Sequence, residues 1–402
     1  MQTLQQALSY IHGRPKRSKR NSLAVMRALL TELNHPEKNL PPLIHVTGTN
    51  GKGSVVAMTA SILEAAGYRT GTFTSPFIED FRERIQVDGQ WISIDDLLSY
   101  TQRVAEAVQR VEQKQADYHP SEFEVVTAIM LTYFAEAHLD AAVIEVGIGG
   151  LYDSTNVLPT SRVGVITSIA LDHQALLGDT LVEIAEQKFG ILHDGMTLVT
   201  GTLPSEVQDR MRAKDYHSVP RKLNEFSSGL AGQYQVENTA TAVAAVRAFD
   251  PDISDQTIAA GLAASRIPGR FEKIGPNILI DGAHNEAGIK ALYQALKAYT
   301  KAPIHLILGT LQDKNLADFL PVLIADPQFS LTLTTFQAPS GRPVLTDDDL
   351  PSDEKLATTS NYQQFFQAKG DQLVVFAGSL YFIAEVRSQY ANRKAPFTTL
   401  DS

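Results

Sequence analysis

The chain has 402 residues, more than a single hydrophobic core usually supports, so two domains are expected. It contains no cysteine, which excludes disulfides, zinc–thiolate sites and cysteine nucleophiles and leaves oxygen and imidazole as ligands for any metal. A formal net charge of -10 argues against a nucleic-acid partner. The N-terminal residues lack the apolar core of a signal peptide, and no segment approaches the ~18 apolar residues of a membrane span, so we expect a cytoplasmic protein without a membrane partner.

The first two thirds of the chain alternate between predicted helices and short apolar strands. Residues 23–33 have apolar side chains at helical spacing, and PPLIHV predicts a strand that runs into a glycine-rich loop. The segment 54–67 then predicts a helix closed by Gly67. Further strands are predicted at 70–74, 141–146, 162–169 and 196–200, with helices at 95–113 and 123–138. This alternation predicts a mostly parallel sheet covered by helices on both faces.

The second part of the chain repeats the alternation after a break. Residues 237–265 predict two helices, and the Gly- and Pro-rich linker 266–276 follows them. Strands are predicted beyond it at 277–282, 304–309, 330–336 and 372–378. The predicted fold is therefore α/β, with a P-loop-type domain at 1–267 and a smaller, Rossmann-like domain at 268–402.

The loop VTGTNGKGS (46–54) has the composition of a phosphate-binding loop but not its usual spacing. In the pattern G-x-x-x-x-G-K-[ST] a hydroxyl follows the lysine, whereas here Gly53 separates Lys52 from Ser54. Glycines permit the dihedrals that turn backbone N–H groups inward, and the lysine and the following helix N-terminus favour an anion. A glycine turn with a solvated lysine is the alternative. The strand–loop–helix context favours phosphate binding.

Three polar residues follow predicted strands and are expected at one edge of the sheet. These are Ser75, Glu145 and His173. Open parallel sheets bind ligands at the carboxyl ends of their strands, and oxygen and imidazole donors suit a Mg²⁺ held partly through water and phosphate. A helix-capping carboxylate and a structural histidine remain open as alternatives. Asp153 and Asn156, on the loop after Glu145, either line the site or form turns.

Four further charged or ionisable residues have two interpretations each. Lys188 lies on a predicted helix, where its pattern alone favours a solvated surface lysine. Arg270 lies in the linker, and Asp281 and His284 follow the first strand of the second domain. Residues at such a hinge either clamp a bridging ligand or form an interdomain salt bridge.

These segments together resemble one protein family. In chain order they are HVTGTNGKGSVVA, SPF followed by ERI, AVIEVGIGGLYDSTN, ITSIALDH, LGDT, IAEQKFGIL, PGRFE, DGAH and AGSLY. The ordered set, from about residue 20 to about residue 382, resembles the folylpolyglutamate synthase/dihydrofolate synthase family of the Mur ligase superfamily. The resemblance implies that the first domain binds ATP and that the second is a glutamate-ligase domain.

The resemblance also implies a reaction. ATP phosphorylates the γ-carboxylate of a folate, and the amine of L-glutamate then displaces phosphate from the acyl phosphate. Such a transfer requires cations and oriented N–H donors. The expected substrates are ATP, L-glutamate and a folate, and a monomer is the family expectation. The motifs do not separate this activity from dihydrofolate synthase, which adds the first glutamate to dihydropteroate. A non-catalytic nucleotide- or folate-binding paralogue is a third alternative.

By position, the resemblance assigns roles to individual residues. ATP contacts are implied for Thr49, Asn50, Gly51, Lys52, Gly53, Ser54, Asn238, Arg270 and Asp281. Magnesium ligands are implied at Ser54, Ser75, Glu145 and His173. Catalytic roles are implied for Lys52, Lys188, His173, Asp281 and His284. Lys188 matches a family lysine that is carbamylated, which reverses the interpretation drawn from its pattern alone.

The chain departs from the family pattern at several positions. The family usually has His, Arg, Ala, His and Pro where this chain has Phe77, Leu151, Phe189, Tyr234 and Glu286. The segment from about 203 to 232 is also short, because a β-rich stretch that is common in the family is missing. These departures leave the choice of folate substrate open.

Overall fold

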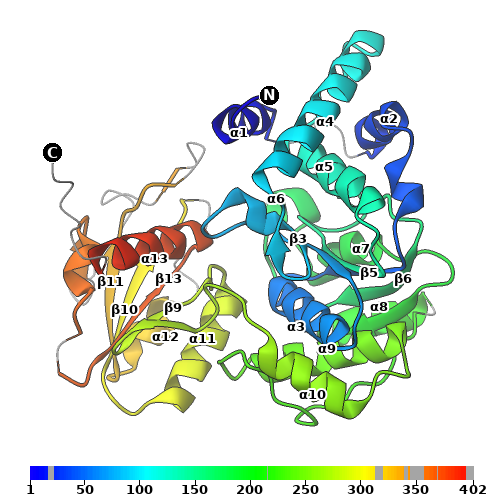
Figure 1. The fold of residues 1–402 in the computed structure, drawn as a ribbon. Coiled ribbons are helices and arrows are strands. Elements are labelled where there is room, and N and C mark those ends of the chain that lie inside the picture. The colour runs from blue at the N-terminus through cyan, green and yellow to red at the C-terminus, as the bar shows by residue number, and fades with distance from the viewer. Residues whose placement is uncertain are drawn as a thin grey trace, which may run out of the picture. The chain divides into compact units, whose positions relative to one another are not determined.

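The computed structural model describes residues 1–16, 22–214, 216–312, 320–338, 343–344, 357–368 and 370–394. The chain forms two compact units (Figure 1). The first unit comprises Met1–Gly229 and Gln235–Arg266, and the second comprises Leu230–Tyr234 and Ile267–Ser402. The short segment 230–234 therefore belongs to the second unit, although first-unit segments precede and follow it in the sequence.

The first unit contains a seven-stranded sheet with the order β4-β3-β2-β5-β1-β6-β7. Its strands are β1 (Leu43–Thr47), β2 (Thr70–Phe73), β3 (Ile85–Val87), β4 (Gln90–Trp91), β5 (Ala141–Glu145), β6 (Ser161–Ile166) and β7 (Thr197–Thr200). The five adjacent strands β2, β5, β1, β6 and β7 are parallel to one another, and β3 and β4 add an antiparallel edge beside β2. The carboxyl ends of β2, β5, β1 and β6 therefore lie next to one another.

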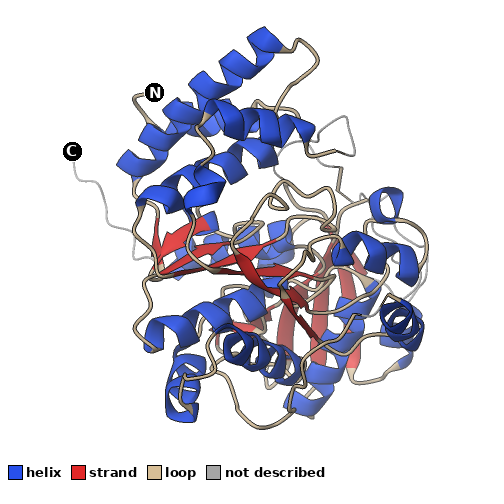
Figure 2. Cartoon of the chain, turned by 90° about the vertical axis from the view of Figure 1, so that its right-hand side faces the viewer, coloured by secondary structure: helices blue, strands red, loops and turns tan. Residues whose placement is uncertain are grey.

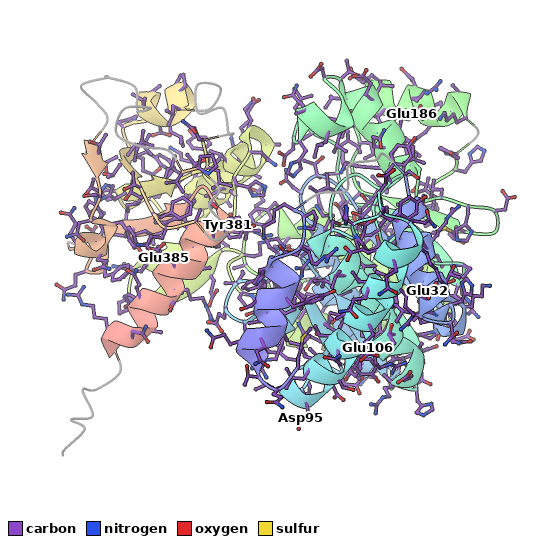
Figure 3. All side chains as sticks on the ribbon, turned by 90° about the horizontal axis from the view of Figure 1, so that it is seen from above. Glu32, Asp95, Glu106, Glu186, Tyr381 and Glu385 are labelled. Atoms are coloured by element: carbon purple, nitrogen blue, oxygen red, sulfur yellow. The ribbon has the colours of Figure 1, made fainter. Side chains whose placement is uncertain are left out.

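Helices cover both faces of this sheet (Figure 2). They are α1 (Leu4–His12), α2 (Ala24–Glu32), α3 (Lys52–Ala65), α4 (Ile94–Lys114), α5 (Glu122–Glu136), α6 (Gln174–Leu177), α7 (Leu181–Phe189), α8 (Ser205–Ala213), α9 (Gln235–Phe249) and α10 (Asp255–Ala264), with short 3-10 helices at Pro36–Asn39 and Phe81–Arg84. Helix α4 begins where the side chain of Ser93 accepts a hydrogen bond from the Asp96 amide. Its polar face, with Asp95 and Glu106, is exposed (Figure 3).

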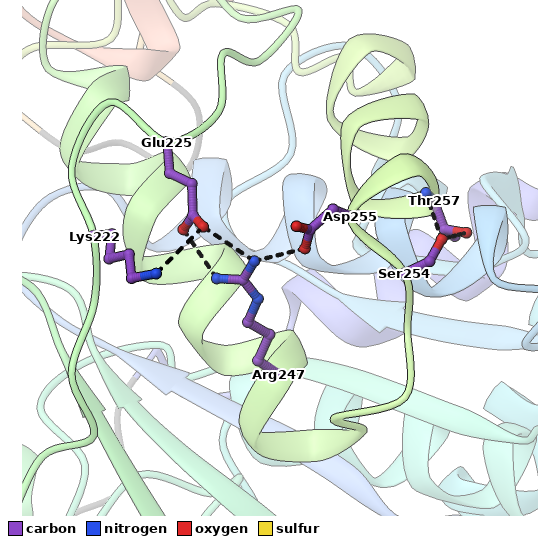
Figure 4. A network of polar contacts seen from close by, with 6 residues as sticks. All are labelled: Lys222, Glu225, Arg247, Ser254, Asp255 and Thr257. Carbon is purple, nitrogen blue, oxygen red and sulfur yellow. Dashed lines mark hydrogen bonds and ion pairs between the residues drawn. The ribbon is translucent and has the colours of Figure 1, made fainter.

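The segment that precedes α9 is held by ion pairs. Arg247 of α9 contacts Glu225 at 2.9 Å and Asp255 of α10 at 2.7 Å (Figure 4). Asp255 lies in the first turn of α10, which Ser254 caps by accepting from the Thr257 amide. One arginine thus joins the irregular segment around Glu225 to two helices.

The second unit contains a six-stranded sheet with the order β12-β11-β10-β13-β9-β8. Its elements are β8 (Glu272–Gly275), β9 (Ile278–Ile280), α11 (Glu286–Tyr299), β10 (Ile304–Gly309), α12 (Leu320–Ala325), β11 (Phe329–Thr334), β12 (Ala357–Thr359), a 3-10 helix (Tyr362–Phe365), β13 (Leu373–Ala377) and α13 (Leu380–Lys394). Every strand pair is parallel except β8 with β9. Two apolar clusters fill its core, one with Leu306 and Val375 and one with Ile307 and Phe376, so alternate residues of β10 and β13 face opposite sides.

The predicted α/β class is confirmed, and the predicted strands and helices are present with small shifts at their ends. One omission is the hairpin of β3 and β4. Its turn is Asp88-Gly89, and both residues have positive φ, at 50° and 67°. Asp-Gly is a strong signal for a two-residue hairpin, but the flanking strands are too short and polar to stand out. Among the described residues no helix is long and apolar enough to cross a membrane.

Candidate functional site

The glycine-rich loop joins β1 to α3, in the strand–loop–helix setting that the sequence predicts. Gly51 caps the 14-residue helix with φ 88°, and a Cβ there would lie 2.4 Å from Oδ1 of Asn238. Only glycine fits this position, because both the backbone conformation and the space exclude a side chain. Lys52 begins the helix, and its Nζ donates to the carbonyl oxygens of Gly48 (3.0 Å) and Thr49 (3.4 Å). The ammonium group therefore folds back over the loop.

The loop is clamped to the segment that follows β6. The amides of Thr49 and Asn50 donate to the carbonyl and the hydroxyl of Ser168, both at 2.9 Å. The Asn50 carbonyl accepts from the hydroxyls of Thr167 (2.6 Å) and Ser168 (3.0 Å). Strand β6 ends at Ile166 rather than at the predicted residue 169, because the next residues bond this loop instead of continuing the ladder. The amides of Thr49 and Asn50 thus fix the loop.

The hydroxyl of Ser54 lies in a buried cluster with two amide side chains of α9. Nε2 of Gln235 donates to Ser54 Oγ at 3.2 Å, and Nδ2 of Asn238 donates to Gln235 Oε1 at 2.8 Å. Exposed fractions are 1% for Ser54, 2% for Gln235 and 9% for Asn238. Asn238 therefore lies beside Gly51, as a nucleotide-side residue would. Gln235 was not predicted, although its i, i+3 spacing to Asn238 puts both on one face of a helix.

Glu145 and Ser75 meet at the carboxyl edge of the sheet. Glu145 ends β5 with 4% of its surface exposed, and its Oε2 accepts from the Ser75 amide at 3.3 Å. His173 precedes α6 with φ 51°, and its amide donates to Oδ1 of Asp172. Across the described ranges no three His, Asp or Glu residues converge as a metal cage. A single buried carboxylate instead suits Mg²⁺, which keeps water and phosphate ligands.

Lys188 is buried near the end of α7, with 3% of its surface exposed. Burial lowers the pKa of its ammonium to about 7; the positive charge of Lys52 adds to this, while Asp172 and Asp153 oppose it. The solvated surface lysine predicted from the helix pattern alone is therefore wrong. The glycine-rich segment 147–151 lies against the last turn of α7. Its Leu151 amide donates to the Gln187 carbonyl at 2.7 Å. The sequence pattern within α7 does not indicate this contact with a distant loop.

Asp153 organises the loop that covers α7. Its carboxylate accepts from the amides of Ile148 and Thr155, each at 3.0 Å, and from the Thr155 hydroxyl at 2.6 Å. The same hydroxyl lies 2.9 Å from Nε2 of His45, on β1. Burial lowers the pKa of His45 to about 3, so its ring is neutral. Because the Thr155 hydroxyl donates its proton to Asp153, Nε2 of His45 is the donor to Thr155. Burial raises the pKa of Asp153, while its hydrogen bonds lower it. Asp153 is thus a turn former beside the Lys188 charge.

Three of the departures from the family pattern have neighbours in the structure that can be identified. Phe189 is 2% exposed and packs on Tyr216 with ring centroids 5.3 Å apart. Phe77 packs edge-on against Phe81 at 5.8 Å. Leu151 lies against Gly190, where a Cβ would come within 2.4 Å of the leucine side chain. Phe189 and Phe77 thus pack against aromatic rings, whereas Leu151 keeps 36% of its surface exposed.

The second unit has its own polar cluster around Asp281. This carboxylate is 3% exposed and accepts from the Tyr234 hydroxyl (2.6 Å) and from the amides of Phe271 and Ala283 (both 2.8 Å). Burial and the neighbouring carboxylate raise the pKa of Tyr234 well above its ordinary value. A Cβ on residue 282 would lie 1.9 Å from Nη1 of Arg270, so the guanidinium group lies directly against the Gly282 backbone. Three of the acceptor positions of Asp281 are thus occupied by its own unit.

His284 lies next to this cluster. Its Nδ1 is 2.8 Å from the Gly282 carbonyl, so Nδ1 carries the proton when the ring is neutral and Nε2 is then the basic nitrogen. Arg270, Asp281 and His284 therefore form one group in the second unit, and the other predicted site residues lie in the first unit.

Two family models match the chain: the Mur ligase middle domain at residues 46–199 and the Mur ligase glutamate ligase domain at residues 269–380. The folylpolyglutamate synthase of Lacticaseibacillus casei is 36% identical over 430 residues, which covers 97% of this chain and 99% of that protein. The chain belongs to the folylpolyglutamate synthase/dihydrofolate synthase family. It is therefore a member of a family of ATP-dependent ligases, as the resemblance implied.

Other members of this family are similar over their whole length. The dihydrofolate synthase/folylpolyglutamate synthase of Bacillus subtilis is 32% identical, covering 96% of this chain and 98% of that protein. A solved FPGS–AMPPCP–folate complex is 35% identical with a TM-score of 0.84, covering 96% of this chain and 98% of the other. The Mycobacterium tuberculosis folylpolyglutamate synthase complexed with ADP is 28% identical with a TM-score of 0.82, covering 96% and 98%. The two-unit architecture is thus shared with the family.

Proposed function

We propose that this chain is an ATP-dependent ligase that adds L-glutamate to the γ-carboxylate of a folate. The observation that carries the proposal is the clamped glycine loop at the N-terminus of α3, with Lys52 above it and the buried Ser54 behind it. A helix N-terminus of this kind favours phosphate groups. Family membership supplies the substrates, since a similar structure holds AMPPCP and folate.

In the first step the carboxylate oxygen of the folate takes the γ-phosphoryl group of ATP, and ADP leaves. Because Thr49 and Asn50 use their amides to fix the loop, we expect the first turn of α3, from Gly51 to Ser54, to contact the phosphates through its N–H groups. Lys52 would exchange its two carbonyl contacts for phosphate oxygens. Its ammonium group would then stabilise the negative charge that accumulates there during transfer. Asn238, beside Gly51, would face the nucleoside part of ATP.

A magnesium ion fits the donors at the sheet edge. Ser54, Ser75, Glu145 and His173 would hold it, with water and phosphate oxygens completing its shell. When bound, magnesium neutralises charge on the phosphates. The position of Glu145 at the carboxyl end of β5 supports this role, since open parallel sheets bind ligands at that edge.

Lys188 is proposed to be carbamylated. With a pKa of about 7, roughly half of its amines are neutral at neutral pH, and a neutral amine adds CO₂ with loss of one proton. The product is a carboxylate that would serve a second magnesium ion. An unmodified lysine with an ordinary pKa would be almost fully protonated at this pH and would not react.

In the second step the amine of L-glutamate attacks the acyl phosphate carbon, and inorganic phosphate leaves. We propose that Arg270, Asp281 and His284 act on the nucleotide and on the incoming glutamate. Nε2 of His284 is the basic nitrogen in the tautomer that the Gly282 contact favours, and in this proposal it accepts the proton that the amine loses. Arg270 would supply positive charge for phosphate or carboxylate.

A second activity is supported by the Bacillus subtilis relative, which is named for both reactions. Adding the first glutamate to dihydropteroate uses the same chemistry on a different carboxylate.

One assay tests both proposals: the purified protein is incubated with ATP, Mg²⁺, L-glutamate and either tetrahydrofolate or dihydropteroate. We expect a product one glutamyl residue heavier than its precursor, formed together with ADP. If ATP binds but neither pterin gains a glutamate, the chain is a nucleotide-binding paralogue. Lys52→Ala should abolish product formation with both substrates.

A further inference from the structure

The side chain of Gln235 links two residues of the nucleotide loop region that belong to different elements. Its Nε2 donates to Ser54 Oγ on α3, and its Oε1 accepts from Asn238 Nδ2 on α9. Gln235 is only 2% exposed, so its amide is held away from water and must find partners inside the protein. Both ends of the amide therefore have a fixed polarity, which runs as a donor series from Asn238 through Gln235 to Ser54.

The surroundings of Ser54 remove its usual alternative partner. A helical serine commonly donates its hydroxyl proton to the carbonyl four residues earlier. That carbonyl belongs to Asn50, and it already accepts from the hydroxyls of Thr167 and Ser168. Gln235 donates to Ser54 and cannot accept its proton through the same Nε2. The serine proton therefore has neither the Asn50 carbonyl nor Gln235 Nε2 as its acceptor.

We propose that Gln235 is a positioning residue that sets the affinity for a magnesium–nucleotide by holding the Ser54 hydroxyl in this orientation. The inference rests on the proposed function only in taking the loop as the site of a magnesium–nucleotide. Without the Gln235 amide, the hydroxyl would rotate freely and the Asn238 amide would lose the partner that fixes which of its ends faces Gly51. Both effects weaken ground-state binding, because the pocket must then order these groups when the ligand enters.

The test measures binding, not turnover. Isothermal titration of the full chain with Mg–AMPPCP compares wild type with Gln235→Leu, which keeps the volume and removes the amide. Losing one such hydrogen bond should raise Kd about tenfold. Thr239→Val is the matched control: Thr239 also joins α9 to α3, through a 3.4 Å contact with Met58 Sδ, but it does not touch Ser54. This variant should bind like wild type, and thermal unfolding should show that both variants are folded.

A double-mutant cycle shows whether Gln235 acts through Ser54. If it does, Gln235→Leu should raise Kd by a smaller factor in a Ser54→Ala background than in wild type, because only its effect on Asn238 remains there, so the two changes should be non-additive. Gln235→Glu, which accepts but cannot donate to Ser54, should also raise Kd. Equal Kd values for wild type and Gln235→Leu, or full additivity with Ser54→Ala, would overturn the inference. Failure of the proposed function looks different: tight Mg–AMPPCP binding that depends on Gln235, without transfer of glutamate to any pterin substrate.

Discussion

Replacing Lys188 by Met should change how the stability of the protein depends on pH. The pKa of the lysine falls from 10.5 to about 7 on folding because the ammonium is buried. Between these values the unfolded chain binds one more proton than the folded chain, so wild-type stability must rise with pH across this window. The slope contributed by one proton is ~1.4 kcal/mol per pH unit, and the whole window corresponds to ~5 kcal/mol.

The methionine variant lacks this group and should lack this slope. Its free energy of unfolding should exceed that of wild type at pH 7 by ~1–4 kcal/mol, because an apolar side chain of similar length needs no desolvation of charge. The difference should shrink towards pH 10. The assay is urea unfolding at several pH values in CO₂-free buffer without nucleotide. Lys222→Met is the control, since the Lys222 side chain is 75% exposed and its variant should follow the wild-type slope.

Parallel pH profiles for wild type and Lys188→Met would refute the reasoning, because they would mean that Lys188 titrates alike in the folded and unfolded chains. In that case the amine would stay protonated at neutral pH, and the carbamate proposed for this residue would lose its chemical basis.

Three other substitutions have defined outcomes. Gly51→Ala should weaken Mg–AMPPCP binding at least ~10-fold in titration calorimetry. The φ angle of residue 51 is 88°, and the added methyl group would lie 2.4 Å from Oδ1 of Asn238. Unchanged affinity would contradict this prediction. Tyr234→Phe should lower the urea stability of the second unit by ~1–3 kcal/mol, since the buried carboxylate of Asp281 loses a donor, and an unchanged midpoint would argue against that bond. Thr155→Val should lower the free energy of unfolding by ~1–3 kcal/mol, because the buried Nε2–H of His45 loses its acceptor and the Asp153 carboxylate loses its hydroxyl donor. Thr160→Val is its control: within the described structure the buried Thr160 hydroxyl has no hydrogen-bond partner, so this variant should not be less stable than wild type.

The sequence was informative wherever a buried strand runs into a polar residue. Such strands read as short apolar runs, and their carboxyl ends must lie at one edge when the sheet is parallel. Ser75 and Glu145 follow strands that prove to be neighbours, and they meet at 3.3 Å. The glycine loop was predictable for the same reason, because it lies between a strand and a helix.

The parts that could not be predicted depend on contacts between distant segments. Lys188 is buried, and the loop 147–151 contacts the backbone of its helical turn; the pattern of its own helix indicates neither fact. Gln235 reaches Ser54 across 181 positions of the chain, so only the fold reveals their pairing. The role of Tyr234 has the same origin, since it bonds an aspartate 47 residues later. Residue patterns indicate buried strands well and contacts between distant segments poorly.

The central claim is that ATP activates a folate carboxylate, and following one oxygen atom tests it most directly. A folate with a heavy oxygen isotope at both oxygens of its γ-carboxylate is incubated with the protein, ATP, Mg²⁺ and L-glutamate, and the released phosphate is examined by mass spectrometry. An acyl phosphate must pass one carboxylate oxygen to the phosphate that leaves, so the account predicts one labelled oxygen per phosphate and one new glutamyl amide per ADP. Unlabelled phosphate, or ADP formed without folate and glutamate, would contradict the account.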